Sequence, residues 1–216
     1  MPMYYMLLDA PLFHRQIVPA LAASWRERSF EPCRPLCRDL VPAARDFASK
    51  YHIGPDELLL AKVARDLPFD RHYWQLLVGE VLLVAAAELP EVPTTPETLC
   101  CLLAAHLYGG TPGSREGFAP IEQAHFGTHY LLFGAHAYRP EDAGYNDVAD
   151  VTRLADYLEA QEPARWTVDD LAPLRDAEDE WERAEELEIA REWFPVLRGL
   201  FRWAQEQGRV IVCERL

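Results

Sequence analysis

The sequence contains few positive charges for its size, and lysine in particular is scarce. Of its 216 residues, 21 are lysine or arginine and 35 are aspartate or glutamate, which gives a formal net charge of −14 at pH 7. The only lysines are Lys50 and Lys62. A protein that binds nucleic acid needs cations to replace the counterions condensed on the phosphates. The composition therefore argues against nucleic-acid binding, and it argues equally against adsorption to an anionic membrane.

Long hydrophobic runs are also lacking. The longest, residues 81–87, lies between Glu80 and Glu88 and is far shorter than the roughly 20 residues that a membrane-spanning helix needs. The first residues lack the cationic start and the small-residue cleavage site of a signal peptide. We therefore expect a cytoplasmic protein that does not enter a membrane.

Cysteine and serine are few, and neither forms a known pattern. The five cysteines, Cys33, Cys37, Cys100, Cys101 and Cys213, are typical of buried free thiols and not of a disulfide framework or a zinc ribbon. Free thiols fit a reducing compartment. Ser114 stands outside a Gly-x-Ser-x-Gly elbow and has no lysine before it, which argues against a serine hydrolase and a P-loop.

The sequence does contain ample material for a helical core. Half of its residues are hydrophobic and 26% are charged, the balance of a globular domain and not of a disordered chain. In most of the chain, apolar residues recur at steps of three and four, the period of an amphipathic helix. The segments with this pattern are 12–28, 36–47, 58–63, 73–89, 99–107, 148–158 and 177–207. We expect a mainly α fold, with Trp181 buried on the inner face of the last helix.

Two short apolar segments at opposite ends of the chain depart from the helical period. Residues 210–213 follow Gly208, a natural helix stop, and residues 4–8 are similarly apolar. They predict a small β element in which the N- and C-terminal segments pair. The Gly- and Pro-rich loop 108–120 is the most flexible in composition. We interpret residues 1–216 as a single helical domain, with this loop as its sub-boundary.

The best candidate for a chemical site lies in residues 121–129. On a helix, Glu122, His125 and His129 fall within an arc of roughly 60°, and on a strand the two histidines share a face. Two imidazoles and a carboxylate can bind zinc or another divalent metal, and His106 or His136 could complete the set. The protein would then be a metal-dependent hydrolase, because a bound metal lowers the pKa of its water.

A structural role competes with this metal site. Gly127 and Gly134 make the segment a poor helix, and its pattern is not His-Glu-x-x-His. Histidines beside Phe126 and Tyr130 are often core residues with satisfied hydrogen bonds. Between the two explanations, we expect the structural one to hold.

A dense acidic run precedes and enters the last predicted helix. A solvated helix face near an N-terminus explains such a run simply, since carboxylates are favourable there. The sharper hypothesis is a docking surface for a basic protein, with Glu178, Glu182 and Glu185 as contacts. The run comprises Asp176, Glu178, Asp179, Glu180, Glu182, Glu185, Glu186 and Glu188.

Of the two functional hypotheses, we favour a non-catalytic binding or protein-interaction module. Like an adaptor or an immunity protein, it would neutralise or escort a basic partner. The alternative is the metal-dependent hydrolase with Glu122, His125 and His129. No motif demands a cofactor, and the metal of the alternative is a divalent ion such as zinc.

The net charge generates a prediction about nucleic acids. We expect no measurable affinity for duplex DNA or RNA at physiological salt, because the net charge of −14 repels a polyanion. An electrophoretic mobility assay at micromolar protein measures this. A salt-sensitive shift of unmodified duplex would contradict the prediction.

Overall fold

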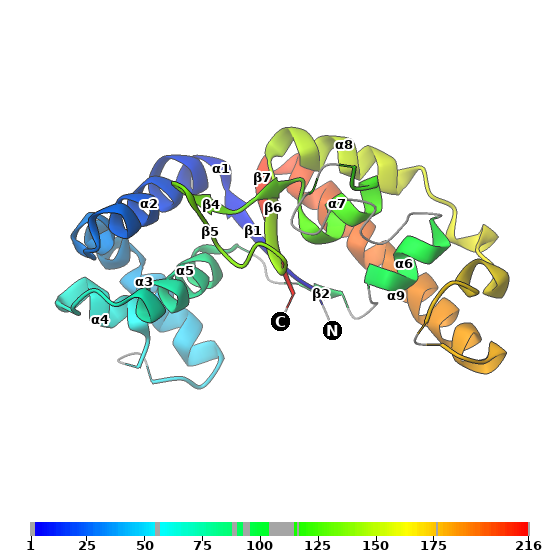
Figure 1. The fold of residues 1–216 in the computed structure, drawn as a ribbon, viewed down its shortest axis with the longest axis horizontal. Coiled ribbons are helices and arrows are strands. Elements are labelled where there is room, and N and C mark those ends of the chain that lie inside the picture. Colours follow the sequence, from blue (N-terminus) through cyan, green and yellow to red (C-terminus); the bar gives the residue numbers. More distant parts are fainter. Residues whose placement is uncertain are drawn as a thin grey trace. The chain divides into compact units, whose positions relative to one another are not determined.

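A computed structural model describes residues 3–54, 57–87, 90–92, 96–103, 115, 117–175 and 177–215. The fold is mainly helical with a small sheet, as the sequence predicts (Figure 1). The chain divides into two compact units, and neither is one continuous segment. Unit 1 comprises Met1–Leu7, Pro90–Tyr130 and Arg139–Leu216, and unit 2 comprises Leu8–Leu89 and Leu131–Tyr138. The single domain predicted for residues 1–216 stays a prediction, and most of the loop 108–120 lies outside the described residues.

Unit 2 consists of helices and one hairpin. Its helical elements are α1 (Ala10–Leu12), the π-helix η1 (Phe13–Ile17), α2 (Val18–Glu27), η2 (Glu31–Cys33), α3 (Arg34–Lys50), α4 (Leu59–Arg65) and α5 (Arg71–Ala85). The hairpin joins β4 (Leu132–Phe133) to β5 (His136–Ala137). Local signals set these bounds. Asp70 caps α5 by accepting from two backbone N–H groups, and α2 ends at Arg28, whose φ is 53°.

The core of unit 2 is built around Trp74 of α5. Its side chain is fully buried, and its Nε1 donates to the carbonyl of Leu21 at 3.2 Å. The Trp74 ring centroid lies 4.7 Å from that of Trp25 and 5.5 Å from that of Phe133. These contacts tie the hairpin to α2 and α5, because aromatic rings bury large areas and pack in tilted or edge-on pairs.

Unit 1 contains a five-stranded sheet in the order β2-β1-β7-β6-β3. The strands are β1 (Met3–Asp9), β2 (Glu91–Val92), β3 (His129–Tyr130), β6 (Ala143–Asn146) and β7 (Arg209–Arg215). Since β1 neighbours β7, the predicted pairing of the N- and C-terminal segments is confirmed. Met3, Tyr5 and Leu7 alternate along β1 and join one core, as the two-residue period of a strand requires.

The helices of unit 1 complete this core. They are α6 (Pro96–Leu102), α7 (Pro120–Phe126), α8 (Val148–Glu159), the 3₁₀ turns η3 (Pro163–Arg165) and η4 (Val168–Leu171), and α9 (Glu180–Glu206). In α9, Leu187, Ala190 and Phe194 are buried at helical spacing. No helix in the described part of the chain is long and apolar enough to cross a membrane.

One predicted core residue of α9 is a surface residue instead. Trp181 is 71% exposed, so the prediction that it is buried is wrong. The helix begins at Glu180, which places Trp181 in the first turn, whereas the buried stripe begins at Leu187. Helical spacing placed Trp181 on the apolar face of the helix, but it could not show that the core ends before the first turn.

Two glycines allow a close backbone contact in unit 1. Gly127 follows α7 with φ 80° and ψ 146°, a conformation open almost only to glycine. A Cβ at Gly127 would overlap the backbone of Tyr145, and a Cβ at Gly144 would overlap the carbonyl of Phe126. The side chain of Arg115 spans the same place, with hydrogen bonds to four backbone carbonyls: Phe126, Gly127, Pro140 and Ala143.

This contact predicts the effect of a single methyl group. We expect Gly127→Ala to lower the free energy of unfolding by about 3 kcal/mol or more, because strained dihedrals and steric overlap add. Chemical denaturation measures the change. Gly199→Ala is the control, since a Cβ there meets open space within α9 and should stabilise the protein by up to about 1 kcal/mol. Equal effects of the two substitutions on the free energy of unfolding would contradict the close backbone contact at Gly127.

Candidate functional site

His125 lies on α7 in the core of unit 1. Its side chain is fully buried, and its Nδ1 is 2.6 Å from the hydroxyl of Tyr5 on β1, a hydrogen bond between elements far apart in the sequence. Its Nε2 is also buried, with no hydrogen-bond partner in the described part of the chain. Burial lowers the pKa of His125 to about 3, so the imidazole is neutral at physiological pH.

Glu122 takes part in the start of the same helix. It is 1% exposed, and its Oε2 accepts a hydrogen bond of 2.7 Å from the backbone N–H of Ala119. This is the reciprocal half of a capping box, which satisfies a backbone donor that the first turn leaves free. The carboxylate therefore has a structural partner within its own helix.

His129 lies beyond the end of α7, on strand β3. Its Nε2 is 2.8 Å from Oδ2 of Asp150, and its side chain is about half exposed. Asp150 also accepts from the backbone of Asp147 and from Arg153, both at 3.2 Å. His129 thus joins a polar network at the start of α8.

The three predicted metal ligands therefore have three separate sets of partners. Because α7 ends at Phe126, His129 does not continue the helical face that carries Glu122 and His125. Within the described ranges, no group of three or more His, Cys, Asp or Glu side chains is arranged to hold a metal ion. His106 lies outside the described residues, and His136 belongs to the hairpin of unit 2. The zinc site and the hydrolase stay predictions.

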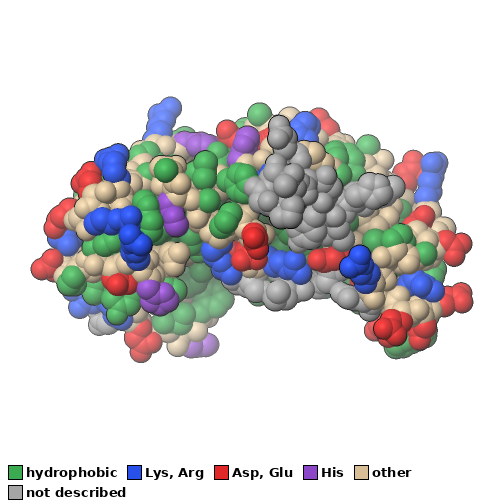
Figure 2. Space-filling view, viewed as in Figure 1, with side chains coloured by type: hydrophobic (Ala, Val, Ile, Leu, Met, Phe, Trp, Pro, Cys, Tyr) green, Lys and Arg blue, Asp and Glu red, His purple; other side chains and the backbone are tan. Residues whose placement is uncertain are grey.

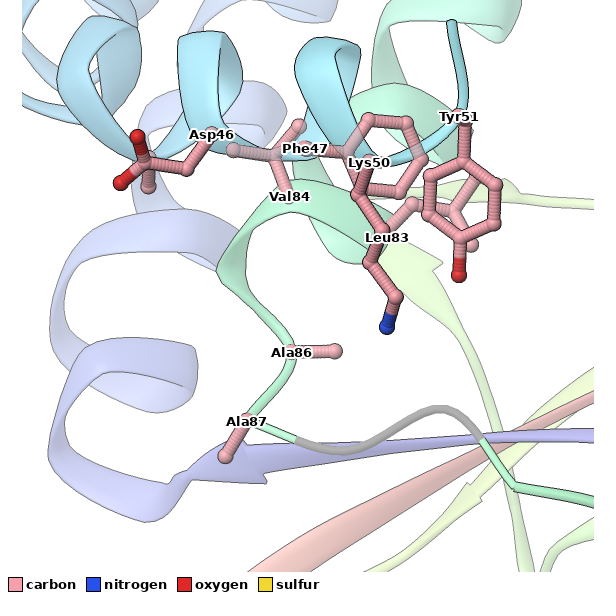
Figure 3. A pocket seen from close by; sticks show the side chains of 9 residues that line it. Asp46, Phe47, Lys50, Tyr51, Leu83, Val84, Ala86 and Ala87 are labelled. Carbon is pink, nitrogen blue, oxygen red and sulfur yellow. The ribbon is translucent and has the colours of Figure 1, made fainter.

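Unit 2 carries a small pocket where α3 and α5 end (Figure 3). Its volume is about 240 Å³, which is small for a drug-sized ligand. Phe47 and Leu83 line it, and Asp46, Lys50 and Tyr51 supply its polar groups. The ammonium of Lys50 lies 5.4 Å from the Tyr51 ring centroid. The pocket does not gather a nucleophile, a base and a positioned partner, so it lacks the arrangement of a catalytic site.

The predicted partner-binding residues differ in their surroundings. Glu178 and Glu185 are exposed. Glu182 instead caps α9: its Oε2 accepts from the backbone N–H of Glu178 at 2.6 Å and of Asp179 at 3.4 Å. The Oδ1 of Asp179 accepts from the N–H of Glu182 at 2.9 Å, which completes a capping box. Glu182 therefore has a structural role at the start of α9, and of the three predicted residues only Glu178 and Glu185 are exposed to a partner.

Sequence reasoning missed a continuous exposed stripe on α9. Trp181, Glu185, Glu188 and Glu192 are all exposed and stand at steps of four, three and four residues. At about 100° per residue they share an arc of roughly 60°. We name these four residues the acidic face of α9. The sequence signal for this exposed stripe was the pair of glutamates, Glu180 and Glu182, that flank Trp181.

Comparison of the chain with protein-family models, with curated proteins and with solved structures found no match.

The environment of His125 predicts an acid-sensitive stability. The pKa of His125 is lower in the folded protein than the value of about 6.5 of an unfolded chain. The unfolded state therefore binds a proton that the folded state excludes, and folding loses stability as pH falls below that value. Between pH 6.5 and 5 we expect this residue to remove up to about 2 kcal/mol from the free energy of unfolding.

Urea denaturation of the protein and of His125→Gln at several pH values measures this effect. The variant should be less stable at neutral pH but should lose less stability on acidification. His14→Gln is the control, because that histidine is exposed in unit 2. Parallel pH profiles of the native protein and His125→Gln would show that His125 is not the acid-sensitive group.

Proposed function

We propose that the protein is a non-catalytic interaction module whose acidic face on α9 binds a basic segment of a partner protein. The observation that carries the proposal is the exposure of Trp181, at 71%, beside Glu185, Glu188 and Glu192, which form no ion pair with any residue that the structure describes. Tryptophan is highly buried on average in folded proteins, and it is enriched among the residues that dominate interface energetics. Within the protein it contributes little to the core.

The charges of α9 support a cationic partner. Among the described residues, five glutamates at the start and along the exposed side of α9 form no ion pair: Glu178, Glu180, Glu185, Glu188 and Glu192. Figure 2 shows Asp and Glu side chains gathered over the start of α9. Arg191, which could oppose them, donates to the backbone carbonyls of Pro163 and Trp166. The negative potential of this surface is therefore left for a ligand to neutralise.

The arrangement matches the recognition of arginine or lysine. A guanidinium or ammonium over a tryptophan face gains cation–π attraction, and tryptophan is enriched among residues that dominate interface energetics. Glu185 and Glu188 stand one and two turns from Trp181, within reach of further cationic side chains on the same segment. Carboxylates around an aromatic anchor also speed association with a basic partner.

The localisation follows from the same proposal and from the thiols. All five cysteines are free, and four of them are buried. We infer a cytoplasmic protein, where thiols stay reduced and basic partners such as nascent or nucleic-acid-binding proteins are abundant.

A defined basic peptide tests the proposed function. We expect a ten-residue arginine-rich peptide to bind in isothermal titration calorimetry, with an affinity that falls as salt rises. Trp181→Ala should weaken binding about tenfold, and Glu185→Gln, Glu188→Gln and Glu192→Gln combined should weaken it by a similar factor. Both variants should keep the melting temperature within a few degrees, because the residues are exposed.

The control variant has the same net charge as the triple α9 variant, but its three neutralised carboxylates lie on a different surface. Asp39→Asn, Asp46→Asn and Glu57→Gln combined neutralise three exposed carboxylates of unit 2. This variant should bind the peptide as the native protein does. If it loses as much affinity as the α9 variant, the peptide responds to overall charge and the acidic face is only a solvated surface. Glu182 is left unchanged, since its replacement would remove a helix cap at a cost of about 1 kcal/mol.

A further inference from the structure

A second cluster of charged and aromatic side chains lies in unit 2, where His136 and Trp25 pack against the core residue Trp74. His136 of β5 stacks on Trp25 of α2, with ring centroids 4.0 Å apart and an interplanar angle of 20°. The guanidinium carbon of Arg28 lies 4.0 Å from the Trp25 ring centroid, and that of Arg71 lies 5.8 Å from it. Three nitrogen-bearing groups therefore gather around one indole.

The two guanidinium groups are not neutralised by the protein. Among the described residues, neither Arg28 nor Arg71 has a hydrogen bond or an ion pair, and both guanidinium groups lie against the Trp25 ring. Both side chains are exposed, so their planar donor edges remain available to a ligand.

The carboxylates closest in sequence to these arginines have other partners. Glu27 pairs with Arg26 at 2.9 Å, and Glu31 pairs with Arg34 at 2.5 Å. Asp70 precedes Arg71 directly, but its Oδ1 accepts from the backbone N–H groups of His72 and Tyr73. The local acidic groups therefore do not occupy the two guanidinium groups.

His136 supplies an independent observation that points to an absent acceptor or donor. Its Nε2 is buried and has no hydrogen-bond partner in the described part of unit 2. A buried polar atom without a partner costs about 1–3 kcal/mol, and such atoms in native proteins call for an explanation. The stacked geometry on Trp25 holds the imidazole in place, so the orphaned nitrogen is not a consequence of a loose side chain.

We propose that Arg28, Arg71 and His136 form a binding site for a phosphate dianion, such as the phosphoryl group of a small phosphate monoester. Two guanidinium charges match the dianion, and their planar forks suit its oxygens. Nε2 of His136 is the third group that would donate to the ion. Because both arginine side chains are exposed, they can move to admit the ion to this nitrogen. All three groups lie against Trp25, and the site is independent of the acidic face of α9.

Figure 2 shows Lys, Arg and His side chains gathered on the surface of this helical unit. The elements that bring the cluster together are the C-terminus of α2, the N-terminus of α5 and the β4–β5 hairpin. Gly134, with φ 67°, makes the tight turn that returns the chain to His136. The site thus depends on the same packing that forms the core of unit 2.

Anion titrations test the site. With the full chain, we expect inorganic phosphate and sulfate to bind in isothermal titration calorimetry and acetate, a monoanion, to bind at least tenfold more weakly. Arg28→Gln and Arg71→Gln should each raise the dissociation constant for sulfate about tenfold or more, as expected for a lost charge-assisted hydrogen bond. Arg15→Gln combined with Arg45→Gln removes two exposed arginines elsewhere in the unit and should leave binding unchanged.

A second readout separates the site from general charge attraction. Burial, Arg28 and Arg71, in that order, lower the pKa of His136. Sulfate keeps its charge across pH 5–8, and its binding beside the arginines should raise this pKa, as NMR of the imidazole would measure. A His136 pKa that sulfate leaves unchanged, or sulfate affinity retained by Arg28→Gln and Arg71→Gln, would overturn the proposal.

Discussion

One partly buried guanidinium, that of Arg115, bridges the two segments of unit 1 that flank His125 and His129. Arg115 donates to backbone carbonyls on both sides of a close backbone contact. On one side the acceptors are Phe126 and Gly127. On the other side they are Pro140 and Ala143. Satisfying four carbonyls with one side chain requires the two segments to pass at a fixed separation. Gly127 and Gly144 are the residues that make this separation sterically possible.

The separate surroundings of the two histidines follow from this constraint. Since α7 must end before Gly127, His125 is the last histidine on the helix and remains in the core against Tyr5. The chain then continues as β3 beside β6, which carries His129 to Asp150. A metal that used both imidazoles would have to compete with these partners and with the backbone geometry that Arg115 maintains.

The sequence predicted local features of this fold well and long-range ones less well. Helix α5 and helix α9 were recognisable from apolar spacing and from caps such as Asp70, because these signals act within a few residues. The pairing of β1 with β7 was predicted from composition. The short strand β6, only four residues long, carries no comparable pattern, and its place in the sheet is set by pairing with β7, which is distant in the sequence, and with β3. For the candidate site, spacing placed His125 and His129 in proximity along the chain but could not show that Tyr5 and Asp150 are their partners.

The way the chain passes between its two units has a consequence for its synthesis. Unit 1 builds its sheet from segments far apart in the sequence, since β1 begins at Met3 and its neighbour β7 ends at Arg215. On the ribosome, the first strand therefore emerges long before the strand beside which it belongs. The helices of residues 10–85 can pack meanwhile, because their contacts are local. Strand β1 can pair with the two-residue strand β2 earlier, but its other edge stays open until β7 has been made, and an open strand edge is prone to aggregation.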